Sequence, residues 1–263
     1  MVKILDCTLR DGGHVNKWNF SNECILDTLK TAENANIDYF EAGYSIPDCI
    51  NSSKIKLCTM VDAKNIHPVS KKSDCVRVAC YPHEIKTAIN AVEDFKNQGF
   101  EVFLHLMTAD KFEDFNLLKN WTNKTILTSI YFADSFGAFT PKDVENIYKK
   151  LECCDFERIS FHAHNNLQLA FANTIKAIEL GAYSVDATVF GIGRGGGNLP
   201  IELLLKYLKK DNSQYLDLIK KYYIDLHKQT NWGYTFEALI GGLNNIHPSK
   251  VSDIINSLNT THN

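Results

Sequence analysis

The chain has 263 residues, of which 44% are hydrophobic and 22% are charged, and its formal net charge at pH 7 is -3. This composition is typical of a globular protein with a substantial core and argues against disorder. Acidic and basic residues are intermixed, so the sequence predicts neither a nucleic-acid partner nor a membrane partner. The first residues enter a strand pattern without an apolar signal segment, which predicts a cytoplasmic protein.

Eight cysteines are scattered along the chain, and none forms a Cys-X-X-Cys pair. Since no secretion signal is recognised, the sequence favours reduced thiols over disulfides, and a structural zinc site is not predicted. Cys7 lies within the most informative motif, but no base is adjacent in sequence. We interpret Cys7 as a small buried residue.

Short β-rich runs alternate with helical patterns from end to end. Strands are predicted at 3–7, 38–42, 55–61, 75–80, 101–107, 129–134, 158–163 and 184–189. Helices are predicted at 22–35, 84–97, 141–151 and 167–180, and a weak helix at 66–73. Capping residues agree with these boundaries, since Ser21 and Thr140-Pro141 precede helical patterns and Gly99 and Gly181 follow them.

Eight such alternations in about 210 residues predict an α/β fold, a (β/α)8 TIM barrel, rather than an open doubly wound sheet. Residues 1–210 would form this catalytic barrel domain. Beyond Asp211 only helical patterns follow, at 214–230, 235–243 and 248–258. The sequence therefore predicts a C-terminal helical extension, residues 211–263, either over the barrel mouth or at the interface of a homodimer.

A metal site is predicted from two segments far apart in the chain. His162 and His164 end a predicted strand, where residues at i and i+2 point to the same side. Both imidazoles could bind one cation, and a carboxylate from another strand end would complete a partial ligand set. Asp11 is the natural candidate, with Arg10 beside it as a fixed positive charge.

Other polar residues also fall where predicted strands end, which is where a barrel enzyme carries its chemistry. The candidates for substrate binding are Glu41, His105, Asp134, Ser135 and Thr188. A polar group at such a position can equally be a satisfied structural group, and about half are expected to be so.

A glycine-rich loop, 191–198, follows the eighth predicted strand. A dinucleotide loop is a weak interpretation, because the acidic residue expected about 20 positions later, after a second strand, has no matching strand. The glycines instead indicate a tight turn or close approach to a ligand. Asn198 could offer its amide oxygen to the metal, or it could cap the helix that begins near Pro200.

Three motifs, taken in chain order, resemble those of a known enzyme superfamily. Asp-X-Thr-Leu-Arg-Asp-Gly near the N-terminus, His-Ala-His-Asn-Asn-Leu on a late strand, and Gly-Ile-Gly-Arg-Gly-X-Gly-Asn-Leu-Pro after the next strand resemble the DRE-TIM metallolyase superfamily over residues 3 to about 208. The resemblance implies that Asp11, His162 and His164 bind a divalent metal, with Asn198 as an additional ligand. It also implies that Arg10 stabilises an enolate oxygen.

Smaller details point within the superfamily to the 4-hydroxy-2-oxovalerate aldolase type. Gly13 stands where the condensing synthases carry glutamate, and the glycine-rich loop lacks the cysteine of the acyl-CoA lyase. His14 matches the aldolase's catalytic base, Asp134-Ser135 resembles its substrate-contacting pair, and Tyr234 matches a catalytic tyrosine. The long C-terminal part that binds an aldehyde dehydrogenase in that aldolase is largely missing, so such a partner is not implied.

The resemblance implies an aldolase that uses Mn²⁺ or Mg²⁺, or alternatively Zn²⁺, on a small 2-oxo acid substrate. A 4-hydroxy-2-oxo acid would be cleaved to pyruvate and an aldehyde through an enolate. The alternatives are an acyl-CoA-dependent Claisen condensing enzyme or lyase, and a catalytically silent binding barrel. The missing glutamate and cysteine argue against the first alternative, and the retained motif residues argue against the second.

Overall fold

The computed structural model describes residues 1–113, 115–247 and 250–260. Eight parallel strands close into a barrel in which each strand pairs with its neighbours in sequence and β1 pairs with β8. The strands are β1 (Lys3–Asp6), β2 (Tyr39–Gly43), β3 (Lys56–Asp62), β4 (Cys75–Cys80), β5 (Glu101–Leu106), β6 (Ser129–Asp134), β7 (Ile159–Ala163) and β8 (Ser184–Ala187). The predicted TIM barrel is confirmed.

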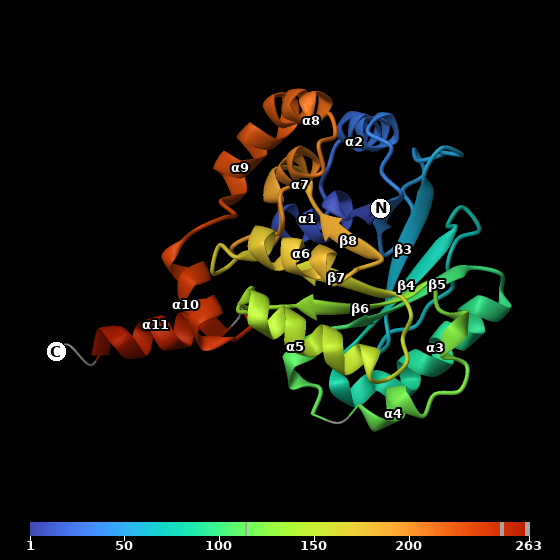
Figure 1. The fold of residues 1–263 in the computed structure, drawn as a ribbon. Coiled ribbons are helices and arrows are strands. Elements are labelled where there is room, and N and C mark those ends of the chain that lie inside the picture. Colours follow the sequence, from blue (N-terminus) through green and yellow to red (C-terminus); the bar gives the residue numbers. More distant parts are fainter. Residues whose placement is uncertain (114, 248–249, 261–263) are drawn as a thin grey trace.

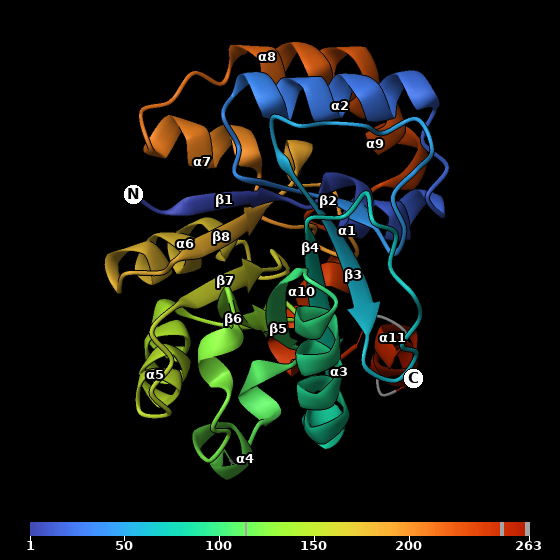
Figure 2. The same ribbon diagram turned by 90° about the vertical axis from the view of Figure 1, so that its right-hand side faces the viewer.

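Helices surround the barrel and cover its outer face (Figure 2). They are α1 (Thr8–Asn16), α2 (Asn22–Asn34), α3 (Ile85–Asn97), α4 (Asn116–Lys119), α5 (Pro141–Glu152), α6 (Ala170–Glu179), α7 (Ile201–Tyr207), α8 (Ser213–Leu218), α9 (Ile224–Thr230), α10 (Phe236–Asn244) and α11 (Val251–Thr260). In the described part of the chain, no helix is both long and apolar enough to span a bilayer.

Two hydrophobic clusters follow from the alternation of side chains along each strand. Inward-facing residues such as Leu5, Phe103 and Tyr131 fill the barrel. Outward-facing residues such as Ile4 and Phe132 pack against the helices. Because the strands are buried on both faces, they read as nearly continuous apolar runs, which is typical of parallel sheets.

Several local signals act as predicted. Ser21 caps α2 by accepting a hydrogen bond from the Cys24 amide. Thr140 forms a capping box with Asp143 at the start of α5. Gly99 and Gly181 follow α3 and α6 with φ angles of +95° and +93°, a conformation that favours glycine.

Two segments differ from the sequence-based expectation. The weak helix predicted at 66–73 is wrong, because this segment is a loop that contains Pro68 and connects β3 directly to β4. Helix α1 was not expected, since Gly12 and Gly13 disfavour helix. A Cβ on Gly13 would lie 2.2 Å from the Trp18 ring, so this glycine is required by tertiary packing rather than by a turn.

The C-terminal helices occupy two different places (Figure 1). Helix α8 lies beside α2, and a π-helical segment, Ile219–Tyr223, joins α8 to α9. There the buried hydroxyl of Tyr215 donates to Asp6, and the buried Tyr223 contacts Thr28. Helix α10 lies at the end of the barrel to which the strands point, and its Ala238 carbonyl accepts a hydrogen bond from Asn166.

Candidate active site

Three potential metal ligands converge at the C-terminal end of the barrel. Asp11 comes from α1, and His162 and His164 come from the end of β7. The Nε2 atoms of the two histidines lie 3.6 and 3.8 Å from Asp11 Oδ2. One donor atom from each residue lies within 4.8 Å of the others, and all three residues are buried. The structure therefore brings together the three residues that the sequence singled out.

The second nitrogen of each imidazole is already engaged. His162 Nδ1 lies 2.8 Å from Asp186 Oδ2, and His164 Nδ1 lies 3.2 Å from the Gly197 carbonyl oxygen. A carbonyl oxygen only accepts, so His164 Nδ1 carries the proton in this contact and Nε2 keeps its lone pair. Such partners fix the tautomer that a metal-binding histidine needs.

Asn198 lies against the same group. Its Nδ2 donates to Asp11 Oδ2 at 2.6 Å and to the Ile192 carbonyl at 2.9 Å, whereas its Oδ1 is buried without a partner among the described residues. Helix α7 is preceded by Pro200 and has no side-chain cap, so the capping alternative is not observed. An unsatisfied buried oxygen beside Asp11 fits an additional hard ligand.

A second cluster of Cys7, His162 and Asp186 also has converging donor atoms. Burial raises the pKa of Cys7 well above its usual value, and its thiol contacts the Ala187 carbonyl. A thiol must lose its proton to bind a metal. The histidine–aspartate group with Asp11 is therefore the better cation site.

Five buried charged residues form a continuous chain of ion pairs beneath this site, which we call the charge network: Asp11, Arg10, Glu41, Arg77 and Asp186. Arg10 contacts Asp11 at 3.0 Å and Glu41 at 2.6 Å, and Arg77 joins Glu41 to Asp186. Three carboxylates and two guanidinium groups leave one net negative charge. A buried negative charge is costly, so this balance fits a bound cation.

The pKa values in the charge network follow from its pairing. Burial by itself would raise the pKa of Asp11, but the charge of Arg10 holds it well below its usual value. Burial opposes ionisation of Asp186 in the same way, and Arg77 lowers its pKa overall. Both carboxylates are therefore ionised at neutral pH, as a metal ligand and its supporting partner must be.

Arg10 retains one free donor. Its Nε and Nη1 are paired, but its Nη2 is buried and has no hydrogen-bond partner among the described residues. A buried charged donor without an acceptor is costly unless a ligand supplies one. The position beside Asp11 is thus prepared for an anionic oxygen.

His14 opens into a cavity of about 200 Å³, which we call the mouth cavity. Its lining residues are His14, Tyr44, Asp62, Lys64, Ala79, Cys80, Tyr81, Glu84, Met107, Arg194 and His247. Burial is the main cause that lowers the pKa of His14 to about 4, although Asp11 opposes the shift. The imidazole is therefore neutral at pH 7 and able to accept a proton.

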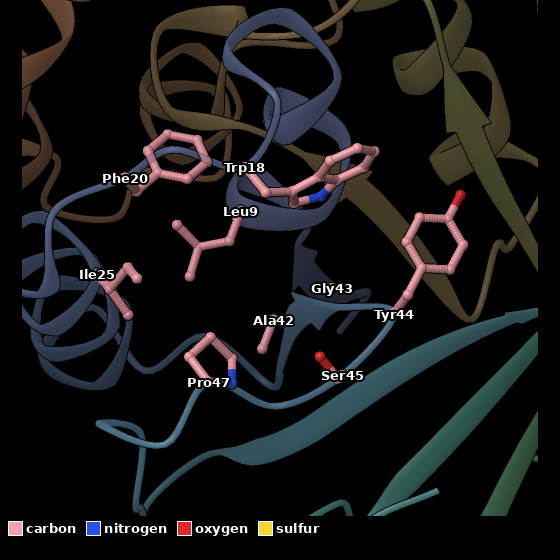
Figure 3. Close-up of a pocket in the computed structure, with 9 residues that line it drawn as sticks. All are labelled: Leu9, Trp18, Phe20, Ile25, Ala42, Gly43, Tyr44, Ser45 and Pro47. Atoms are coloured by element: carbon pink, nitrogen blue, oxygen red, sulfur yellow. The ribbon is translucent and has the colours of Figure 1, made fainter. Parts of the chain in front are cut away.

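A larger apolar pocket of about 310 Å³ lies on the outer side of α1 (Figure 3). Leu9, Phe20, Ile25 and Pro47 gather around it, and Trp18 and Tyr44 form its other walls. The Trp18 ring also packs edge-on against His14, with centroids 4.7 Å apart. Tyr44 lines both this pocket and the mouth cavity.

Two of the predicted substrate-binding residues, His105 and Ser135, lie beside the proposed metal ligands, and Thr188 follows Asp186 by two positions on extended backbone. His105 is buried on β5 with its ring 5.5 Å from that of His162. Ser135 lines a small cleft together with His164 and Arg194. The hydroxyl of Thr188 is buried and has no partner among the residues described.

The other predicted residues are placed differently. Glu41 is fully buried and its carboxylate binds Arg10 and Arg77. Asp134 accepts hydrogen bonds from the amides of Ala138 and Phe139, since Ser135 and not Asp134 follows the inward-facing register of β6. Tyr234 is 64% exposed and is not among the residues that line the mouth cavity or the apolar pocket. Roles for these residues in binding or catalysis stay predictions.

Sequence reasoning missed three residues of the site. Arg77 lies within a strand that reads as apolar, and its charge at a central strand position was the signal that could have identified it. Arg194 was read only as part of the glycine-rich loop, yet it lines the mouth cavity. His247, in the predicted C-terminal extension, carries no sequence motif and lines the same cavity.

Comparisons with known proteins agree with this site. A family model described as HMGL-like matches residues 51–231. A 4-hydroxy-2-oxovalerate aldolase from Bacillus cereus is 28% identical over 243 residues, covering 80% of this chain and 70% of that protein. An oxaloacetate decarboxylase from Mycobacterium tuberculosis is 24% identical over 234 residues, covering 79% and 70%.

One solved structure covers almost the whole chain. It is the N-terminal domain of a protein assigned as an aldolase from Bacteroides vulgatus, with 32% identity and a TM-score of 0.87 over 97% of this chain and 96% of that one. The fold, the site and these relatives define the protein as a carbon–carbon lyase built on a TIM barrel. The chain belongs to the HMGL-like family of DRE-TIM metallolyases.

Proposed function

We propose that this protein is a divalent-metal-dependent aldolase that interconverts a 4-hydroxy-2-oxo acid with pyruvate and an aldehyde. The observation that carries the proposal is the buried, unpartnered Nη2 of Arg10 beside the converging donors of Asp11, His162 and His164. A cationic donor at this position would stabilise an enolate oxygen, which is the charge that develops when the carbon–carbon bond breaks. The name of the Bacillus cereus relative supports the same reaction.

Asp11, His162 and His164 would hold the metal, with Asn198 Oδ1 as an additional ligand. Mixed carboxylate, imidazole and amide donors favour Mn²⁺ or Mg²⁺, with Zn²⁺ as the alternative. When bound, such an ion acts as a Lewis acid toward the oxygens of a 2-oxo acid. Asp186 would keep His162 in the orientation that binding requires.

His14 would act as the base in the cleavage direction. It removes the proton from the C4 hydroxyl, the C3–C4 bond breaks, and C4 leaves as the aldehyde. The electron pair of the broken bond becomes the enolate of pyruvate, whose oxygen accepts a hydrogen bond from Arg10. A proton then returns to C3, which completes pyruvate. The low pKa of His14 keeps it neutral and competent at neutral pH.

The remaining predicted contacts follow from the same arrangement. Ser135 and His105 would contact the 2-oxo acid, since Ser135 lines a cleft with His164 and the His105 ring lies beside that of His162. Thr188 would contact it through its buried, unpartnered hydroxyl. Glu41 would act through Arg10, whose guanidinium it orients. Substrate contact by Asp134 and catalysis by Tyr234 remain predictions that no contact in the described structure supports.

We also propose that residues 1–210 are the catalytic barrel domain and that the part of the extension (211–263) beyond α9 covers the barrel mouth. His247 lines the mouth cavity with His14, which supports this arrangement. Removal of residues 231–263 is expected to retain the metal but lower activity, because a closed site excludes water from the enolate. The homodimer and the cytoplasmic location stay predictions.

The test is an assay of the purified protein with Mn²⁺. Cleavage of 4-hydroxy-2-oxovalerate to pyruvate is expected, and addition of chelator should abolish it. His14→Ala should lose cleavage yet retain decarboxylation of oxaloacetate, if wild type shows it, because that reaction has no hydroxyl proton to remove. Turnover of acetyl-CoA with 2-oxo acids, without any aldol cleavage, would instead identify a Claisen enzyme and contradict the proposal.

A further inference from the structure

The mouth cavity differs from the apolar pocket in the chemistry of its walls. It adjoins His14, the proposed base, and its lining includes the charged residues Asp62, Lys64, Glu84 and Arg194. The apolar pocket of Figure 3 has only uncharged walls, and His14 is not among its described lining residues. The part of the substrate that leaves as the aldehyde must lie next to the base. It therefore faces the polar cavity.

Arg194 is the unusual residue in this cavity. The guanidinium groups of Arg10 and Arg77 are held by buried carboxylates, whereas Arg194 forms no ion pair within the part of the chain that the structure describes. Its side chain is half-buried, and it also lines the small cleft that contains Ser135 and His164. Arg194 thus lies between the proposed base and the proposed 2-oxo acid site.

The positive charge of Arg194 also acts on the two histidines that line the mouth cavity. Its charge contributes to lowering the pKa of His14 and of His247, after the larger effect of burial in each case. Neither acidic residue of the cavity forms an ion pair with Arg194 in the described part of the chain. Glu84 accepts a hydrogen bond from the Tyr81 amide, and the pKa of Asp62 is raised by burial and lowered chiefly by Lys64, then by Arg10.

We propose that the aldehyde portion of the substrate carries an anionic group, a carboxylate or a phosphate, and that Arg194 binds it. This inference rests on the proposed function and names the substrate class of the same site. A half-buried guanidinium without a carboxylate partner is the usual device for binding such a group, because its donors match two oxygens of one anion. Arg194 is then the residue that determines aldehyde specificity.

The experiment compares matched aldehydes in the addition direction, with pyruvate and the Mn²⁺-loaded protein. Butanal is paired with succinic semialdehyde for the carboxylate, and glyceraldehyde with glyceraldehyde 3-phosphate for the phosphate. We expect a higher kcat/KM for at least one anionic member. Arg194→Gln should lower that value by about 10- to 100-fold, mainly through KM, and leave the neutral member unchanged. Arg158→Gln, an exposed arginine at the start of β7, is the matched control.

Two further measurements separate this proposal from the proposed function. Exchange of the pyruvate methyl protons reports enolate formation without any aldehyde, so its absence together with absent addition would count against the function alone. Calorimetric titration with glycerol 3-phosphate and butyrate, against glycerol and butanol, then reports anion binding directly. Binding of an anion that is lost in Arg194→Gln supports the proposal. Equal use of neutral and anionic aldehydes, or binding that Arg194→Gln does not weaken, overturns it.

Discussion

The charge network and the mouth cavity lie at the same end of the barrel but differ in how their charged groups are paired and buried. In the network each carboxylate faces an arginine, and the groups are buried on strands or on α1. In the mouth cavity Lys64 and Arg194 lie on loops, whereas Asp62 ends β3 and Glu84 directly precedes α3. These four residues are more exposed than those of the network, and Arg194 has no carboxylate partner in the described structure. The network thus holds its charged groups in fixed pairs, whereas Arg194 keeps its guanidinium without a carboxylate partner, as the proposed anion site requires.

The same contrast is visible among carboxylates. The pKa of Asp186 is lowered because, although burial opposes ionisation, Arg77 more than compensates. The Asp134 carboxylate at the end of β6 has only two backbone amides as partners among the residues that the structure describes, and burial raises its pKa to about 7. Burial is similar in the two cases, so the arginine makes the difference. This comparison leads to four predictions.

The largest effect is expected from substitution of the proposed metal ligands. His162→Ala and His164→Ala should each lose the bound metal and reduce turnover by about 1,000-fold or more, since a Lewis acid lowers the activation barrier by several kcal/mol. Metal analysis after dialysis against chelator and readdition of Mn²⁺ measures the loss. If both variants keep wild-type stoichiometry and activity, the metal binds elsewhere. His83→Ala, an exposed histidine, is the control.

Arg10→Gln should reduce kcat by roughly 100- to 1,000-fold, the loss typical for removal of one oxyanion donor. Asp11 and both histidines remain in place, so metal stoichiometry should be close to that of wild type. The paired measurement of metal content and kcat distinguishes loss of enolate stabilisation from loss of the ion. A variant that loses both in parallel would show that Arg10 supports the metal site instead.

Arg77→Met tests the pairing within the charge network. The substitution leaves Glu41 with Arg10 alone and Asp186 without an arginine, and it should lower the free energy of unfolding by about 3–5 kcal/mol. Urea denaturation measures the change. Arg158→Met, at an exposed position, should have little effect. An unchanged unfolding free energy for Arg77→Met would show that the buried pairs contribute no net stability.

The smallest effect concerns Asp134. Its pKa of about 7 lies above the ordinary value of 3.8, so between these pH values the folded protein binds a proton that the unfolded chain does not. Stability should therefore fall as pH rises through this window and level off above it. Asp134→Asn, compared with wild type and with the exposed control Asp225→Asn, should show a shallower fall in urea midpoint between about pH 5 and about pH 8. Identical slopes would contradict the raised pKa.

The pattern of residues along the chain is enough to predict the barrel and the group of proposed metal ligands. Parallel strands covered by helices must be apolar on both faces, so all eight could be read from composition and turn signals, within one or two residues of their observed ends. His162 and His164 point the same way because a strand has a period of two. Asp11 could be added because the ends of parallel strands meet at one end of a barrel.

Which polar groups are partners follows only from the folded barrel. The pairing of Arg77 with Glu41 and Asp186 joins three different strands. Arg77 and Asp186 are 109 positions apart in the sequence, so no local sequence pattern could predict their contact. Helix α1 forms despite two glycines because Trp18 packs on the surface that Gly13 leaves open. The environment of Arg194 depends on His14 and His247, which come from opposite ends of the chain. Spacing fixes which way a side chain points from its own strand, but burial and charge pairing arise only when the barrel closes.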